Sequence, residues 1–165
     1  MEALVQWFTT NLSGVLSKEL IAFIVSMIPI LELRGGLLAA SWMHIDMIRA
    51  ILICVIGNII PIPFILLLIT KIFNILKQTH IFKPMVEKLE RKALGKKDQI
   101  EKYEFWGLVL FVGIPLPGTG AWTGALIASL IGIRFRKAFP AIVLGILLAT
   151  CIMTIVSYGI LGKVW

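Results

Sequence analysis

The sequence predicts an all-α integral membrane protein made of two inverted-topology repeats, each a re-entrant helical hairpin followed by one transmembrane helix. Three observations predict this fold: the composition, two interruptions in apolar segments, and an internal repeat. Hydrophobic residues make up 59% of the 165 residues, and charged residues make up 15%. A soluble domain of this composition would expose a large apolar surface to water. We therefore expect one membrane domain, residues 1–165, that crosses a bacterial or archaeal cytoplasmic membrane more than once.

Two segments rich in proline and glycine, 29–36 and 115–122, interrupt stretches that would otherwise be expected to form continuous transmembrane helices. Irregular backbone at membrane depth persists only where it is buried in protein or lines a cavity. Breaks at corresponding positions in two halves of a chain are typical of the substrate site of a transporter. The two segments therefore predict a transport site where they meet.

An internal repeat relates the two halves at an offset of 88 residues (124 − 36 = 88). Between positions 36 and 57, eight of 22 aligned residues are identical: Gly36/Gly124, Leu38/Leu126, Ala40/Ala128, Ser41/Ser129, Ile45/Ile133, Ala50/Ala138, Val55/Val143 and Gly57/Gly145. Such self-similarity indicates a duplicated structural unit. A transmembrane composition shared by both halves is the alternative explanation.

The elements follow in order along the chain. Residues 1–19 are expected to form an interfacial helix, because the amphipathic stretch is too short to span about 30 Å of hydrocarbon. Residues 20–76 form the first repeat, with a broken segment at 20–42 and a long run at 47–76 that Pro61 and Pro63 can kink. Residues 77–104 form a charged cytoplasmic helical linker. Residues 105–165 form the second repeat, with a broken segment at 105–131 and a span at 138–161.

The positive charges predict the topology. Eight of the 16 Lys and Arg residues lie between Lys77 and Lys102, and a second basic cluster lies at 134–137. Basic residues in short loops stay in the cytoplasm. Opposed re-entrant hairpins place both clusters on that side, whereas four complete crossings would separate them. Acidic residues interleave with the bases in the linker and no reading motif is present, so nucleic-acid binding is not expected.

Glu32 and Arg34 are the candidate functional charges, because a charged side chain near the bilayer centre is costly unless it faces a cavity or a partner. Glu32 is the expected proton-coupling residue. Arg34 can hold phosphate or carboxylate oxygens with its planar fork. In a continuous helix the two side chains would point in different directions, but an unwound tip would let both reach one cavity. A mutually neutralising Glu32–Arg34 pair that only holds the tip together is the alternative.

The second break is uncharged and is expected to open a half-helix that runs from Ala121 to Ile131. Free N–H groups at a helix start attract anions, and glycine lets a ligand approach the backbone. The same segment could instead be a simple tight bend. Asn58 is expected either to line the site or to form a helix–helix hydrogen bond. The predicted substrate-binding residues are Arg34, Gly35, Gly36, Asn58, Pro115, Pro117, Gly118, Thr119, Gly120 and Thr123.

The motifs Glu32-Leu-Arg-Gly-Gly36 and Pro115-Leu-Pro-Gly-Thr-Gly-Ala-Trp-Thr-Gly124 resemble the signatures of the small multidrug export protein family over nearly the whole chain. That family is similar in outline to the DedA/VTT superfamily, whose members are thought to have opposed hairpins and to translocate lipids such as undecaprenyl phosphate. The resemblance implies that Glu32 is the acidic residue of the first hairpin. DedA proteins carry basic residues near the second hairpin, and the nearest ones here are Arg134 and Arg136, which join the substrate-binding candidates.

The combined interpretation is a transporter that flips a phosphorylated polyprenyl lipid, or a similar amphipathic anion, in exchange for protons. Proton-coupled export of small lipophilic compounds is the alternative within transport. An enzyme is not expected, because neither an activated nucleophile nor a metal cluster is recognisable, and no cofactor or metal is expected. A membrane scaffold is the remaining alternative. The expected partners are membrane lipids, the substrate and protons, and small residues at Gly145 and Ala149 suggest a homodimer edge.

Overall fold

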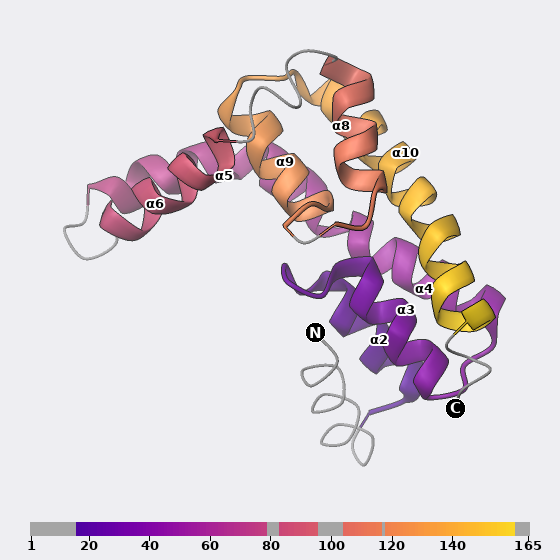
Figure 1. The fold of residues 1–165 in the computed structure, drawn as a ribbon. Coiled ribbons are helices and arrows are strands. Elements are labelled where there is room, and N and C mark those ends of the chain that lie inside the picture. The colour runs from indigo at the N-terminus through magenta and orange to yellow at the C-terminus, as the bar shows by residue number, and fades with distance from the viewer. Residues whose placement is uncertain (1–15, 79–82, 96–103, 117, 161–165) are drawn as a thin grey trace.

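The computed structural model describes residues 16–78, 83–95, 104–116 and 118–160, and within these ranges every regular element is a helix (Figure 1). The helices are α2 (Lys18–Met27), α3 (Glu32–Trp42), α4 (Met47–Ile59), α5 (Pro61–Lys77), α6 (Lys83–Leu94), α8 (Glu104–Gly113), α9 (Ala121–Leu130), α10 (Phe135–Thr154) and the π-helix η1 (Ile155–Ile160). The all-helical prediction is confirmed for this part of the chain. Most of the interfacial helix predicted at 1–19 lies outside the described residues, and Lys18 and Glu19 belong to α2.

Two helical runs, Met47–Lys77 and Phe135–Ile160, are long and apolar enough to cross a membrane. They correspond to the spans predicted at 47–76 and 138–161. In the first run α4 ends at Ile59, and Pro61 begins α5, as expected for a residue that lacks a backbone N–H. In the second run Pro140 lies within α10 without ending it. Many of their large apolar side chains are exposed.

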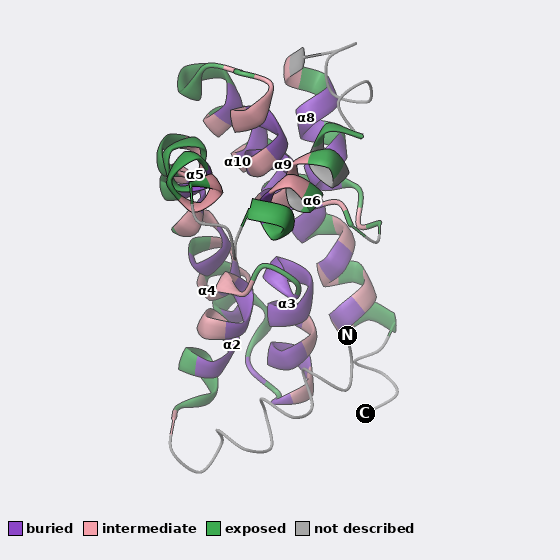
Figure 2. Ribbon diagram, turned by 90° about the vertical axis from the view of Figure 1, so that its left-hand side faces the viewer, coloured by how far each residue is buried: buried purple, intermediate pink, exposed green. Residues whose placement is uncertain are grey.

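Two helical hairpins meet tip to tip. Hairpin 1 consists of α2 and α3, and hairpin 2 consists of α8 and α9. The described residues of their tips, 28–31 in hairpin 1 and 114–116 and 118–120 in hairpin 2, lie side by side at the middle of the molecule, while the far ends of the hairpins point apart (Figure 1). Buried residues line the hairpins and the inner faces of the long helices, as the rotated view in Figure 2 shows. The fold therefore brings together the two segments that the sequence singled out.

The same backbone turn occurs twice, 88 residues apart. At the end of α3 the Ile45 N–H donates to Ala40 O (3.0 Å), and at the end of α9 the Ile133 N–H donates to Ala128 O (2.9 Å). This is the hydrogen bond of a Schellman cap, which requires a left-handed residue just before the donor. His44 occupies that position in the first turn with φ 55°, and Gly132 occupies it in the second with φ 77°.

Glycine allows close packing at equivalent places in both halves. A Cβ on Gly57 of α4 would lie 2.8 Å from Phe23 O of α2, and a Cβ on Gly145 of α10 would lie 2.9 Å from Val109 O of α8. Each long helix therefore packs through a glycine against the backbone of the first helix in its hairpin. The edge predicted for a homodimer is used inside the chain, since Gly145 and Ala149 are both buried.

Candidate functional site

Glu32 of hairpin 1 binds the start of α9 in hairpin 2. One carboxylate oxygen accepts the Ala121 N–H at 3.0 Å, and the other accepts the Trp122 N–H at 3.0 Å. The side chain is only 5% exposed. A carboxylate at this position satisfies two N–H groups of the first turn and interacts favourably with the positive end of the helix. Glu32 therefore serves as an N-terminal cap supplied from 89 residues away.

The backbone at both tips is shaped for this contact. Glu32 has φ 49°, an uncommon value for a residue with a side chain. Such conformations cost about 1 to 3 kcal/mol and persist where the surrounding structure imposes them. Opposite it, Gly120 has φ 137°, and a Cβ there would collide with the Glu32 carboxylate. The absence of a side chain at Gly120 therefore makes room for the carboxylate.

Arg34 binds the backbone that follows α8. Its Nη1 donates to Leu116 O (2.7 Å), and its Nη2 donates to Thr119 O (3.2 Å) and Ile114 O (3.4 Å) and lies 2.9 Å from Thr119 Oγ1. These carbonyls lie just beyond the end of α8, where a cation is favoured by the helix dipole. Arg34 is 8% exposed. The two charges of hairpin 1 thus complement both helix ends that meet at the tip of hairpin 2.

A contact in the opposite direction comes from Trp122. Its indole Nε1 donates to Met27 O (3.1 Å), the carbonyl of the last residue of α2. Trp122 lies 88 residues after Arg34, so equivalent positions in the two halves each donate to the end of the first helix in the opposite hairpin. Trp122 is not among the residues predicted from the sequence, although its 88-residue offset from Arg34 is a signal that points to it.

The predicted glycines of the first break have a packing role. The break itself covers only 28–31, and Glu32, Arg34, Gly35 and Gly36 all belong to α3. A Cβ on Gly35 would lie 2.6 Å from Leu31 Cβ, and one on Gly36 would collide with the Ser26 hydroxyl. The expected unwound tip at Glu32 to Gly36 is therefore wrong. The helix admits both charges because they lie in its first turn, where the side chains reach past the end.

The charged groups at the tips have different partners from those expected from the sequence. The hydrogen bonds of the Glu32 and Arg34 side chains go to hairpin 2, and the only ion pair among the described residues joins Lys77 and Glu90. The guanidinium of Arg34 and the first amides of α9, both expected to hold an anionic group, are bound within the chain. In this state the site is closed on itself.

The other predicted residues lie at varying distances from this contact. Thr119 is part of it, and its hydroxyl also accepts the Leu116 N–H at 3.2 Å. Pro115 and Thr123 are half-buried near it, Gly118 is exposed in the same tip, and Pro117 lies outside the described residues. Asn58 is buried in α4, and its Oδ1 has no hydrogen-bond partner among the residues that the structure describes. Arg134 and Arg136 are exposed at the start of α10, beyond the far end of α9, and the structure does not bring them to the tips.

Comparison with known proteins relates the chain to a protein family. A family model described as "Putative small multi-drug export protein" matches residues 32–152, which include both tips. No curated protein shows significant similarity to the chain, and no solved structure does. Within the described residues, no group of three or more His, Cys, Asp or Glu side chains could hold a metal ion.

Proposed function

The chain belongs to the small multi-drug export protein family, and we propose that it exports small lipophilic compounds across the membrane in exchange for protons. One observation carries the proposal: the buried Glu32 carboxylate joins the tips of the two hairpins. A carboxyl group at membrane depth is a functional candidate because it can carry a proton across a hydrophobic region. The family description supports export of lipophilic compounds over the translocation of a lipid phosphate.

In the proposed topology each hairpin enters the membrane and returns on the same side, and Met47–Lys77 and Phe135–Ile160 are the spans. The repeated turns and the opposed hairpins support an inverted repeat. α5 packs against α9 through the Ser129 hydroxyl, which donates to Leu66 O, so the end of α5 lies on the side where α10 begins. The basic residues of α6 and those at the start of α10 then lie on the same side of the membrane, which supports a cytoplasmic position for both.

Protonation of Glu32 would weaken the contact between the tips. The charged carboxylate accepts one N–H with each oxygen, whereas a protonated carboxyl has one oxygen that carries hydrogen and accepts poorly. The first turn of α9 then loses part of its cap. Two states, one with the tips joined and one with them released, are what proton-coupled exchange requires.

The released state offers a site to the substrate. When the tips separate, the carboxyl group of Glu32 and the apolar side chains around it, such as Leu31, Leu33 and Ala121, become accessible. A lipophilic compound with one positive charge would match an apolar surface with a single carboxylate. Proton and substrate would then compete for the same group.

Translocation of an amphipathic anion such as a polyprenyl phosphate is the second candidate. One observation favours it: release of Glu32 would also free the amides of Ala121 and Trp122, and an anion could bind them beside Arg34. Both candidates use the same contact, and they differ in the charge of the compound that replaces it.

Transport by the purified protein in proteoliposomes tests the proposal. We would measure a fluorescent lipophilic cation and a short fluorescent polyprenyl phosphate, each with and without a pH gradient. The matched variants are Glu32→Gln and Glu19→Gln, which remove a carboxylate from the tip and from the exposed first turn of α2.

We expect gradient-driven transport of the cation that Glu32→Gln abolishes and Glu19→Gln leaves unchanged. Gradient-driven movement of the polyprenyl phosphate alone would favour the second candidate. A folded wild type that moves neither compound, or that moves one equally well with Glu32→Gln, would contradict proton coupling at this site.

A further inference from the structure

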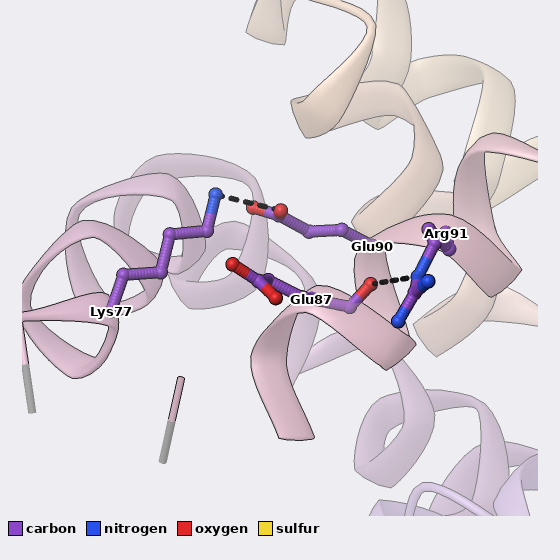
Figure 3. Close-up of polar contacts among 4 residues, drawn as sticks. All are labelled: Lys77, Glu87, Glu90 and Arg91. Carbon is purple, nitrogen blue, oxygen red and sulfur yellow. Dashed lines mark hydrogen bonds and ion pairs between the residues drawn. The ribbon is translucent and has the colours of Figure 1, made fainter. Parts of the chain in front are cut away.

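The charges of α6 separate onto two sides of the helix. Glu90 forms an ion pair of 2.7 Å with Lys77 at the end of α5, and the Glu87 carboxylate points the same way (Figure 3). Val86, on the same inner side, is fully buried. Arg91 lies farther from Lys77 than Glu87 and Glu90 do in Figure 3, and its Nε donates to Glu87 O (3.4 Å). Arg91 is exposed, and so is Lys88, one turn earlier. The acids are therefore turned inward, and the outward side of α6 is basic.

The length of the preceding helix places α6 near a membrane surface. Residues Met47–Lys77 form a run of 31 residues, which at 1.5 Å per residue is about 46 Å long. The hydrocarbon core is about 30 Å thick, so the end of α5 extends to headgroup depth. Ile72 and Ile75 are exposed there, and Ile75 is 64% exposed. These apolar side chains favour the membrane interface over water for this end of the molecule.

We propose that the basic outward side of α6, made of Lys88 and Arg91, binds the phosphate groups of anionic phospholipids in the cytoplasmic leaflet. The inference rests on the membrane placement proposed above but not on transport. Two features select lipid over nucleic acid: the exposed apolar side chains near the end of α5, the helix against which α6 packs, and the exposed Met85 on α6 itself. The Lys77–Glu90 pair holds α6 against α5, so the bases stay at the depth of the headgroups.

A quenching assay on the full chain in vesicles tests the inference. A fluorophore is attached at Met85→Cys in a Cys151→Ser background, since Cys151 is exposed and Cys54 is buried. Nitroxide-labelled phosphatidylglycerol and nitroxide-labelled phosphatidylcholine are each added to phosphatidylcholine vesicles. The ratio of their quenching constants gives the preference for anionic lipid near α6.

We expect Lys88→Gln/Arg91→Gln to lower this preference by up to about 30-fold, since each surface base contributes about 1 kcal/mol to attraction by anionic lipid. Lys88→Arg/Arg91→Lys should retain the preference, and about 0.5 M salt should reduce it in the unaltered protein. The control Arg134→Gln/Arg136→Gln removes two exposed charges from the start of α10 and should leave the ratio at Met85→Cys unchanged.

Three results would overturn the inference. The first is equal quenching by both lipids in the unaltered protein, and the second is a preference that survives the loss of both bases. The third is displacement of the anionic lipid by a short oligonucleotide at equal charge concentration, which would identify a nucleic acid as the preferred ligand. Unchanged thermal unfolding of the double variant would exclude loss of fold as the cause of a positive result.

Discussion

The two hairpins share one backbone plan and differ in the side chains at their tips. Residue 32 in hairpin 1 and residue 120 in hairpin 2 both have positive φ at the start of a helix, but one is Glu and the other is Gly. Two positions later in each hairpin, Arg34 makes contacts with three residues and Trp122 donates one side-chain hydrogen bond. Hairpin 1 thus supplies charged side chains, and hairpin 2 supplies the backbone groups that they bind.

This difference shows how two hairpins of similar backbone form a specific contact. Glycine at position 120 carries no group that could compete for the α9 amides, and it leaves the space that the Glu32 carboxylate fills. Equivalent packing glycines keep the two hairpins similar elsewhere. Substitutions at the packing glycines and at the tips can separate the packing that both halves share from the charged side chains that only hairpin 1 supplies.

The largest effect is expected for Gly120→Ala. The added methyl group meets both an unfavourable φ and the Glu32 carboxylate, so the free energy of unfolding should fall by about 3 kcal/mol. Gly132→Ala is the matched control, because it shares the positive φ but has nothing within 4 Å of the added Cβ; it should cost only about 1 kcal/mol. Chemical unfolding in detergent measures both.

A double-mutant cycle sharpens this result. If the collision is with the carboxylate, combining Gly120→Ala with Glu32→Ala should cost less than the sum of the two single changes. Strict additivity would show that strain at Gly120 alone explains its effect.

Arg34→Gln should have the next largest effect, about 2 to 3 kcal/mol, because it leaves several part-buried carbonyl groups without a charged donor. Arg34→Lys should fall between this variant and the wild type, since an ammonium group cannot reproduce the fork of the guanidinium. The control Arg49→Gln, at an exposed position of α4, should leave stability unchanged. Equal losses for Arg34→Gln and Arg49→Gln would contradict a role for Arg34 in joining the hairpins.

The packing glycines predict losses of stability for both Gly57→Ala and Gly145→Ala. Each added Cβ would meet a backbone carbonyl, at 2.8 Å and 2.9 Å respectively, and the Cβ at Gly145 would also lie 2.6 Å from Val112 Cβ. Each should destabilise by about 2 kcal/mol through overpacking. A loss for one and not for the other, measured by the same unfolding assay, would show that the two halves are packed differently.

The smallest effect is expected for Trp122→Phe. It removes the hydrogen bond to Met27 O and keeps most of the ring packing, so it should cost about 1 kcal/mol. Trp122→Ala provides the comparison in which packing is lost as well. A cost for Trp122→Phe as large as that of Arg34→Gln would show that the side chains of both hairpins contribute equally to the contact between the tips, contrary to the difference described above.

Local features of the fold could be predicted from the sequence, because they follow from local chemistry. Pro115 to Gly120 indicated a break before α9, and the structure starts this helix at Ala121. The long apolar runs indicated the two spans, and the 88-residue offset matches the repeated turns. Burial of Glu32 and Arg34 could also be expected from their apolar surroundings.

The partners of these side chains could not be predicted, since they depend on contacts between residues more than 80 positions apart. The sequence does not show that the Glu32 carboxylate caps α9 or that Arg34 binds the end of α8. It also suggested that Gly35 and Gly36 unwind the chain, because a helix with closely packed glycines has the same local signal as a break. Whether Gly145 faces the interior of the chain or a second copy depends on where α8 packs, and no local sequence pattern specifies that position.

The most direct test of the central claim is the distance between the tips as a function of protonation. Spin labels at Ile30→Cys and Leu116→Cys, both exposed positions at the tips, report this distance by pulsed electron resonance in a Cys151→Ser background. We expect a single short distance at high pH, and longer distances both at low pH and in Glu32→Gln at every pH. One unchanged distance across the pH range and in Glu32→Gln would contradict the claim that the Glu32 carboxylate joins the two hairpins.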